Sequence, residues 1–235
     1  MDQFLGSRSQ FPDSNLELEI RRALNKPQGA ITNFDLETLT GTFAADEKGI
    51  TDLTGLEDAI NLTGLVLNNN PITEITPLSS LTQLIGLLIP NSRVVDVSPL
   101  ANLTRLEGLI LHGNLITDVD SLSGLTNLVT LVLSENQITN VDGLSGLINV
   151  SELRLGDNQI SDISALSTLD SLSFLGLENN QITDIQALVD NSGLIIDRSV
   201  NLSGNPLGND AQCIQIPILI QRLVNVAYDQ TIQCK

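Results

Sequence analysis

The chain has 235 residues, of which 41% are hydrophobic and only 3% are aromatic. Its 28 acidic and 11 basic side chains give a formal net charge of −17 at pH 7, which argues against a nucleic-acid partner and an anionic membrane surface, because both attract Lys and Arg. No apolar run approaches the roughly 18 residues that a membrane-spanning helix needs, so we expect no membrane insertion. The start, MDQFLGSRSQFPD, lacks the regions of a signal peptide, which leaves either a cytosolic protein or a leader outside this chain.

Two short helices are predicted in the N-terminal segment. The first follows Asp13, a good N-cap residue, and four apolar residues share one of its faces: Leu16, Ile20, Ala23 and Leu24. The second is expected to run from Thr32 to Gly41, with Leu36 and Leu39 facing inward.

A 22-residue repeat fills the middle of the chain. Six phrases each begin 22 residues after the previous one: GLVLNNN at Gly64, GLLIPNS at Gly86, GLILHGN at Gly108, TLVLSEN at Thr130, ELRLGDN at Glu152 and FLGLENN at Phe174. A degenerate unit begins at Phe43, and a last unit begins at Val200 after a three-residue insertion near Asp190. This periodicity predicts a solenoid of eight turns.

The repeat template, L-x-L-x-x-N followed by apolar residues at every third position, has a direct physical interpretation. The two Leu of L-x-L point to one side of a short strand and the middle residue points to the other. The later spacing of three favours short 3₁₀ or extended segments. The Asn is surrounded by core positions, so its amide must bond the turn backbones of its own coil and the next. We therefore predict a structural Asn ladder, which Ser92 interrupts and locally weakens: Asn70, Asn114, Asn136, Asn158, Asn180 and Asn205.

The outward residues of L-x-L form a column in which four consecutive coils carry an aliphatic side chain. An exposed apolar stripe of this kind is typical of a partner surface. The alternative is that Val and Ile occupy it only because strands favour them. With its neighbours, this column provides the candidate ligand-binding residues: Val66, Leu88, Ile110, Val132, Arg154, Phe174, His112 and Glu152. The expected rim is acidic: Asp46, Glu47, Glu107, Glu135, Asp157 and Glu178.

We identify no catalytic motif, metal site or cofactor site in the sequence. His112 is the only histidine, and its position in the repeat tolerates any residue type, so we interpret it as a solvated side chain. A second column is acidic, with one Asn: Asp52, Glu74, Asp96, Asp118, Asn140, Asp162 and Asp184. It is either a row of cation sites or, as we favour, a set of carboxylates that accept backbone N–H bonds at the next helical turn.

The C-terminal segment predicts a helix and a last strand. Asp210 is a candidate N-cap, and Pro217 breaks or restarts the helix. A final strand is expected at Val224, Val226 and Tyr228.

Together, the repeat and the helical start resemble bacterial internalin-like leucine-rich repeat proteins of the 22-residue class, over nearly the whole chain. The resemblance implies an α/β solenoid: a right-handed horseshoe with a concave parallel β-sheet of about eight strands, convex 3₁₀ segments and helical caps at both ends. It divides the chain into an N-terminal cap (1–41), repeats (42–207) and a C-terminal cap (208–235). Because an uncapped solenoid exposes its core, we expect these caps to complete the folding unit.

The resemblance also bears on Cys213 and Cys234. Members of the family are mostly secreted or surface-exposed, which favours a disulfide between the two, stabilising the fold by about 3 kcal/mol. The alternative is a pair of reduced thiols.

By resemblance, the expected function is a non-enzymatic module that binds a protein ligand through the concave face, for adhesion or host interaction. We expect a monomer that is extracellular or at the bacterial cell surface. The alternatives are a structural spacer that presents a fused domain, or a cytoplasmic repeat protein resembling a phosphatase regulator. Carbohydrate binding is disfavoured because aromatic stacking surfaces are scarce.

Overall fold

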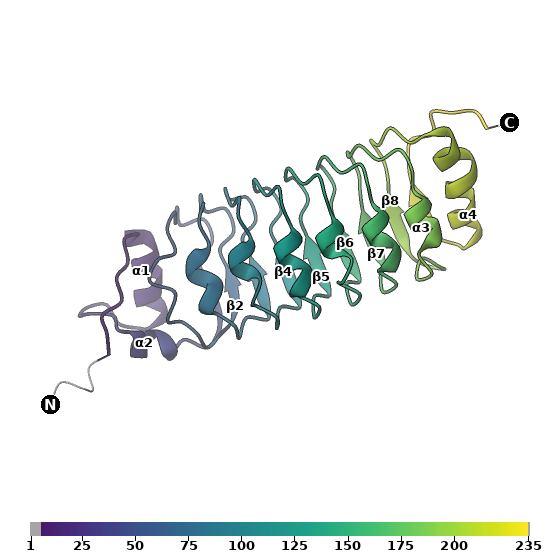
Figure 1. Ribbon diagram of the computed structural model, residues 1–235. Helices are drawn as coiled ribbons and strands as arrows, with labels where there is room; N and C mark the ends of the chain where they lie inside the picture. The colour runs from purple at the N-terminus through teal and green to yellow at the C-terminus, as the bar shows by residue number, and fades with distance from the viewer. Residues whose placement is uncertain (1–5, 235) are drawn as a thin grey trace.

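The computed structural model describes residues 6–234, so residues 1–5, with the start of the predicted N-terminal cap, and Lys235 lie outside it. Within the described part, nine parallel strands form one sheet in chain order: β1 (Gly41–Ala44), β2 (Leu62–Val66), β3 (Gly86–Leu88), β4 (Gly108–Ile110), β5 (Thr130–Val132), β6 (Glu152–Arg154), β7 (Phe174–Gly176), β8 (Ser199–Asn201) and β9 (Asn225–Ala227). Figure 1 shows the coils stacked along one axis, with the chain ends at opposite ends of the stack. The predicted solenoid is confirmed.

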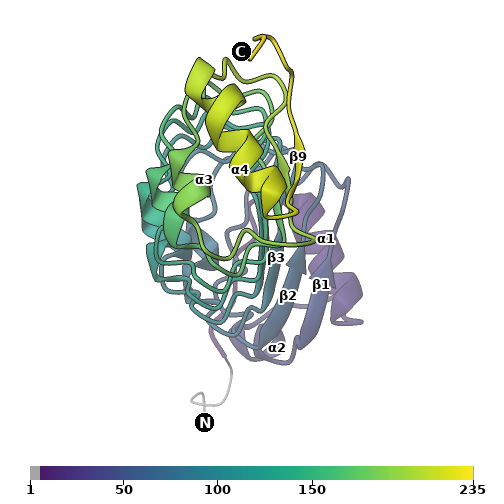
Figure 2. The ribbon, with the colours of Figure 1, turned by 90° about the vertical axis from the view of Figure 1, so that its right-hand side faces the viewer.

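In the coils of β2 to β7, a short helical turn lies on the side opposite the strand, as the end-on view in Figure 2 shows. Their bounds are η1 (Thr76–Ser80), η2 (Ser98–Leu100), η3 (Asp120–Gly124), η4 (Asp142–Leu144), η5 (Ser164–Thr168) and α3 (Gln186–Asp190). The first five are 3₁₀ segments, as the spacing of three predicted, while α3 is a single α-helical turn. None of the described helices is long and apolar enough to cross a membrane.

The core lies between the sheet and these turns. Leu109 and Leu111, the two leucines of one L-x-L phrase, are both 0% exposed. The same positions are buried in every coil, and the apolar side chains form one continuous cluster that reaches from Leu16 in the N-terminal helix to Val224 at the far end. Continuity of the core explains why each coil needs its neighbours to be stable.

The Asn ladder stabilises the turn that follows each strand. In the coil of Asn136, the side-chain Oδ1 accepts the N–H of Ile116 at 3.0 Å, and Nδ2 donates to the carbonyls of Leu111 and Leu133 at 3.1 and 3.0 Å. The Leu111 carbonyl also accepts from Asn114, so one carbonyl serves two successive rungs. All six predicted Asn residues make this set of bonds, because a buried amide must satisfy its donors and acceptor.

Ser92 makes only part of this pattern. Its hydroxyl donates to the carbonyl of Asn70, and the N–H of Ile72 also turns to that carbonyl, at 2.8 Å. As a result, the carbonyls of Leu67 and Ile89 each accept a hydrogen bond from one Asn side chain, whereas the Leu111 carbonyl accepts from two. The predicted interruption is therefore present.

Beside the ladder runs a column of left-handed residues that the sequence did not predict. The residue just before each ladder position has a positive φ, from 52° at Asn179 to 77° at Gly204: Glu47, Asn69, Asn91, Gly113, Glu135, Asp157, Asn179 and Gly204. Asn and Gly tolerate this conformation, and Glu does so at a cost. The three acidic members belong to the predicted acidic rim, so part of that rim occupies a conformationally restricted turn.

The acidic column next to the helical turns serves the backbone. Six of its seven members accept the N–H of the residue two positions later: Asp52, Asp96, Asp118, Asn140, Asp162 and Asp184. Bonding by the Ser164 N–H and hydroxyl lowers the pKa of Asp162. The described residues contain no cluster of three or more potential metal ligands. The favoured interpretation, a local backbone role, agrees with these bonds.

At the N-terminal end, α1 (Ser14–Ala23) and α2 (Asn33–Glu37) cover the first coil. Asp13 caps α1 as predicted: its Oδ1 accepts the N–H groups of Asn15 and Leu16. Its Oδ2 accepts the N–H and hydroxyl of Thr51 and the N–H of Asp52, so one carboxylate also docks the helix onto the repeats. Burial opposes ionisation of Asp13, but these N–H and hydroxyl donors outweigh it and lower the pKa.

Two details of this end differ from the prediction. Ala23 is exposed and is not part of the buried face of Leu16 and Ile20. The second helix ends at Glu37 with Thr38 as its C-cap, and Gly41, with a φ of 71°, already begins β1. Leu36 and Leu39 face inward as expected.

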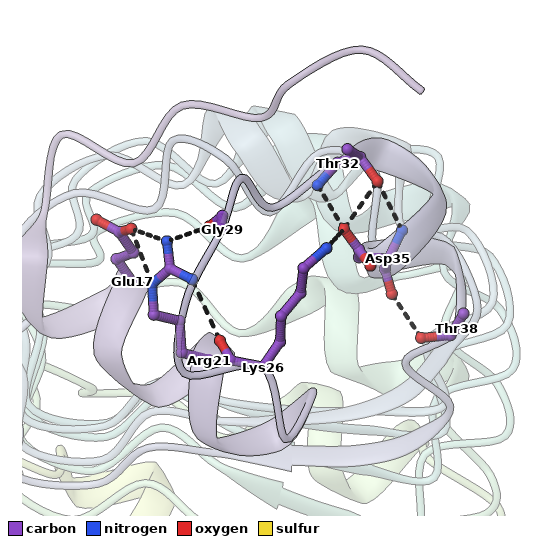
Figure 3. A network of polar contacts seen from close by, with 7 residues as sticks. All are labelled: Glu17, Arg21, Lys26, Gly29, Thr32, Asp35 and Thr38. Atoms are coloured by element: carbon purple, nitrogen blue, oxygen red, sulfur yellow. Dashed lines mark hydrogen bonds and ion pairs between the residues drawn. The ribbon is translucent and has the colours of Figure 1, made fainter. Parts of the chain in front are cut away.

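A polar network ties the two helices together (Figure 3). Arg21 bonds Glu17 at 2.7 Å and the carbonyls of Lys26 and Gly29. Lys26 then reaches Asp35 at 2.6 Å, and this ammonium lowers the pKa of Asp35. The loop between the helices is thereby held from both sides.

At the C-terminal end, a helical segment and β9 close the stack. The helix consists of a π-helical turn, η6 (Ala211–Gln215), which passes into α4 (Ile216–Gln221), so Pro217 lies inside a continuous helical run, directly after the π-helical turn, and does not break it. The N-cap prediction for Asp210 is wrong: the residue already has helical φ and ψ, and its side chain makes no capping bond. The predicted last strand is present as β9.

Two interactions fasten the C-terminal tail to that helix. Cys213 and Cys234 form a disulfide with a Cα–Cα distance of 5.4 Å. The buried Gln212 accepts the N–H groups of Thr231 and Ile232 and donates to the carbonyl of Leu207.

Candidate protein-binding face

The outward residues of the strands stand in one column across the sheet. Strand pairing places Val66 opposite Leu88, Leu88 opposite Ile110, and Ile110 opposite Val132. The column continues through Arg154 and then Gly176. The register is the one expected from L-x-L, in which the middle residue faces away from the core.

The four aliphatic members are half-buried, in contrast to the fully buried Leu and Ile residues on either side of them in sequence. Next to this column lie Gly86 and Gly108, and a Cβ built on either would meet no atom within 4 Å. The aliphatic side chains therefore border open space on the concave face. The aliphatic column and the open space above the two glycines together form a surface that is complementary to an apolar ridge.

His112 lies on the other side of the column. It is half-buried, and no hydrogen bond of its imidazole is found among the described residues. Its backbone carbonyl accepts the N–H of Asn91 at 2.8 Å and so belongs to the coil-to-coil pairing.

Farther along the sheet the face becomes charged and aromatic. The guanidinium of Arg154 lies 4.4 Å from the centre of the Phe174 ring, a cation–π arrangement. Its Nε donates to the Glu152 carboxylate at 2.7 Å. Three of the predicted site residues, from β6 and β7, are thus in direct contact, and they follow the aliphatic stripe without a break.

Similarity to known proteins bears on this face as well. Over 93% of this chain and 94% of the other, the structure resembles internalin C2 from Listeria monocytogenes, with 34% sequence identity and a TM-score of 0.82. The chain belongs to the internalin family of leucine-rich repeat proteins. Leucine-rich repeat solenoids are typically protein-interaction modules.

Further comparisons extend the likeness of this internalin-family protein. A second internalin from Listeria monocytogenes (inlF) is 24% identical over 98% of this chain and 95% of that chain, with a TM-score of 0.54. A leucine-rich repeat protein of Leptospira interrogans is also 24% identical, over 83% of this chain and 50% of that chain, with a TM-score of 0.68. The family model for leucine-rich repeats in two copies matches residues 104–146 and 148–190. No curated protein sequence matches the chain.

One feature of this internalin-family face was not predicted. Glu178 was expected only as part of an acidic rim, but its side chain folds back over the sheet toward Gly156 and Gly176. The sequence signal for this is the coincidence of two glycines in adjacent coils with an acidic residue beside them. Each of these three positions varies from repeat to repeat, so the sequence pattern does not indicate that they interact. Their proximity becomes visible only when the coils are stacked.

Proposed function

We propose that this protein is a non-enzymatic binding module that recognises a protein ligand through its concave face. The observation that supports this most is the in-register column of Val66, Leu88, Ile110 and Val132 beside the open space above Gly86 and Gly108. Their burial is not needed for the core, which the flanking leucines already fill. Exposed apolar surface of this kind favours a partner.

We further propose that the protein works outside the cell, secreted or at the bacterial surface, in adhesion or host interaction. The Cys213–Cys234 disulfide supports this, because disulfides persist in oxidising compartments and are rare in the cytosol. It also disfavours the alternative of a cytoplasmic phosphatase regulator, for which free thiols would be expected.

The proposal is tested by replacing one outward aliphatic residue with Asp. We expect Ile110→Asp or Val132→Asp to fold with the same circular dichroism spectrum and to lose capture of the partner from host or bacterial surface extracts, with bound proteins identified by mass spectrometry. The outward carboxylate is solvated in the free protein but must be desolvated against an apolar ridge in the complex.

The matched control is Val95→Asp, the same kind of change at a residue that is 51% exposed beside η2, away from the strands. This variant should capture the partner as well as the wild type does. Equal capture by all the variants would instead favour a structural spacer that presents a fused domain. Unfolding of Ile110→Asp would contradict the outward register itself.

A further inference from the structure

The Glu178 carboxylate lies in an unusual place on the concave face. A Cβ on Gly176 would be 3.1 Å from its Oε2 and 3.3 Å from Cε1 of Phe174. A Cβ on Gly156 would collide with the same carboxyl group. Glu178 therefore lies across the bare backbone of β7 and the neighbouring coil, beside the Phe174 ring, in room that exists because both positions are glycine.

Among the residues that the structure describes, no cation pairs with this carboxylate. Its Oε2 is buried, and no hydrogen-bond donor within the described residues reaches it. The nearest strand cation, Arg154, is bonded to Glu152 and stacked on Phe174. Leaving a buried charged acceptor unsatisfied is unfavourable, so a donor that reached this carboxylate would be favoured.

The local charges indicate which donor fits. Glu152 and Arg154 neutralise each other, which leaves the Glu178 carboxylate without a cation among the described residues of this part of the face. The whole chain carries a formal charge of −17, so a cationic group is attracted and an anionic one repelled. A guanidinium suits the site best, since it carries several N–H donors and can stack on an aromatic ring.

We propose that Glu178 is a specificity-determining residue that accepts a basic side chain, arginine in preference to lysine, from the protein ligand. This inference depends on the concave face being the binding surface, and it names the chemistry at one end of that surface. The aliphatic column binds the apolar part of the ligand, while Glu178, Phe174 and the glycine backbone receive the cation. Val132 and Arg154 lie where the two parts meet.

The test uses N-acetyl-arginine methylamide as the probe and its neutral isostere, N-acetyl-citrulline methylamide, as the chemical control. Both are titrated into the full chain while the ¹³C shift of the Glu178 carboxyl and the ring signals of Phe174 are followed by NMR. We expect the arginine probe to shift both signals with a dissociation constant of about 1–10 mM, the range of a single-group contact. The citrulline probe should leave both signals in place.

The variant Glu178→Gln keeps the shape and removes the charge, and the Phe174 signals should then require at least tenfold more arginine probe. Glu135→Gln, on the exposed rim, is the matched control and should respond like the wild type. Equal responses of wild type and Glu178→Gln, or equal shifts with both probes, would overturn the inference. The concave-face proposal would still stand or fall separately, on partner capture by Ile110→Asp.

Discussion

The two ends of the solenoid are closed by different interactions. Each end must cover an apolar core that would otherwise meet water. At the N-terminal end, the α1 helix is docked by hydrogen bonds from the first coil to the carboxylate of Asp13. At the C-terminal end, a covalent bond between Cys213 and Cys234 and the buried amide of Gln212 hold the tail against the helix.

This difference means that the ends should respond to different conditions. A carboxylate that accepts several N–H groups stabilises only while it is ionised, so the N-terminal end is sensitive to acid. A disulfide does not titrate, so the C-terminal end is sensitive to reductant instead. Between them the repeats share one lattice of leucines and asparagines, and each coil depends mainly on its neighbours.

The largest effect is expected from breaking the disulfide. The double variant Cys213→Ser/Cys234→Ser should lose about 3 kcal/mol of unfolding free energy, because the bond closes a loop of about 20 residues in the unfolded chain. Urea unfolding measures the loss. Dithiothreitol should lower the stability of the wild type by a similar amount and leave the double variant unchanged.

Hydrogen exchange would locate that loss. The N–H groups of Thr231 and Ile232, which bond to Gln212, should exchange faster in the double variant, while those bonded to Asp13 should not change. Faster exchange at both ends would show that the ends are coupled and would remove the contrast between them.

A smaller effect is expected from Asp13→Asn. Asn caps a helix about as well as Asp, so α1 keeps its cap. However, the amide NH₂ cannot accept from Thr51 and Asp52, and their N–H groups would lose their acceptor. We expect a loss of about 1–3 kcal/mol at pH 7, measured by urea unfolding, which is the cost of an unsatisfied buried donor.

The pH dependence gives the sign of this effect. The folded pKa of Asp13 is lowered, so its contribution is present above the unfolded value of about 3.9 and is lost as the pH falls through the folded value. The stability gap between wild type and Asp13→Asn should therefore close between about pH 5 and pH 2. Acid also reduces the repulsion among the other carboxylates, but this changes the stability of both proteins equally and so does not affect the difference between them.

Asp162→Asn is the control for that experiment. The pKa of Asp162 is also lowered, by the N–H of Ser164, but Asn140 makes the same bond from the same position in the preceding coil. The change should therefore cost much less than Asp13→Asn. A loss as large as that of Asp13→Asn would mean that negative charge itself, and not the docking geometry, stabilises this protein.

The ends also show which features could be predicted from the sequence and which could not. The repeat lattice was predictable because each core position recurs, so the inward Leu pairs, the Asn ladder and the outward column all followed from one template. Asp13 was predictable as a cap, since that role is local. Its bonds to Thr51 were not, because they join residues that are far apart in the chain.

The missed features share this non-local character. Gln212 holds a tail 19 residues away, and the buried Asn191, near the three-residue insertion, donates to the carbonyls of Leu166 and Leu169 in the preceding coil. Asp210 was assigned as a cap from its residue type alone, although the helix already includes it. Within the site, the outward register followed from the alternation of a strand, but the position of Glu178 depends on Gly156 and Gly176 in adjacent coils.

The smallest effect is expected between the two ends, at Ser92. An Asn at this position would accept the Ile72 N–H and donate to the carbonyls of Leu67 and Ile89, which would complete the ladder between Asn70 and Asn114. Because the two existing bonds to the Asn70 carbonyl, from the Ser92 hydroxyl and from the Ile72 N–H, are lost, the net gain from Ser92→Asn should be about 1 kcal/mol in urea unfolding.

The opposite change, Asn136→Ala, removes all the side-chain bonds of one ladder residue and should cost about 1–3 kcal/mol, since it leaves the Ile116 N–H buried without an acceptor. Amide exchange separates the two coils: the Ile72 N–H should exchange faster than the Ile116 N–H in the wild type and equally slowly in Ser92→Asn. If Ser92→Asn were destabilising, the backbone of the turn after β3 would differ from that of the other turns. The interruption of the Asn ladder would then be due to this backbone conformation and not to the short side chain of Ser92.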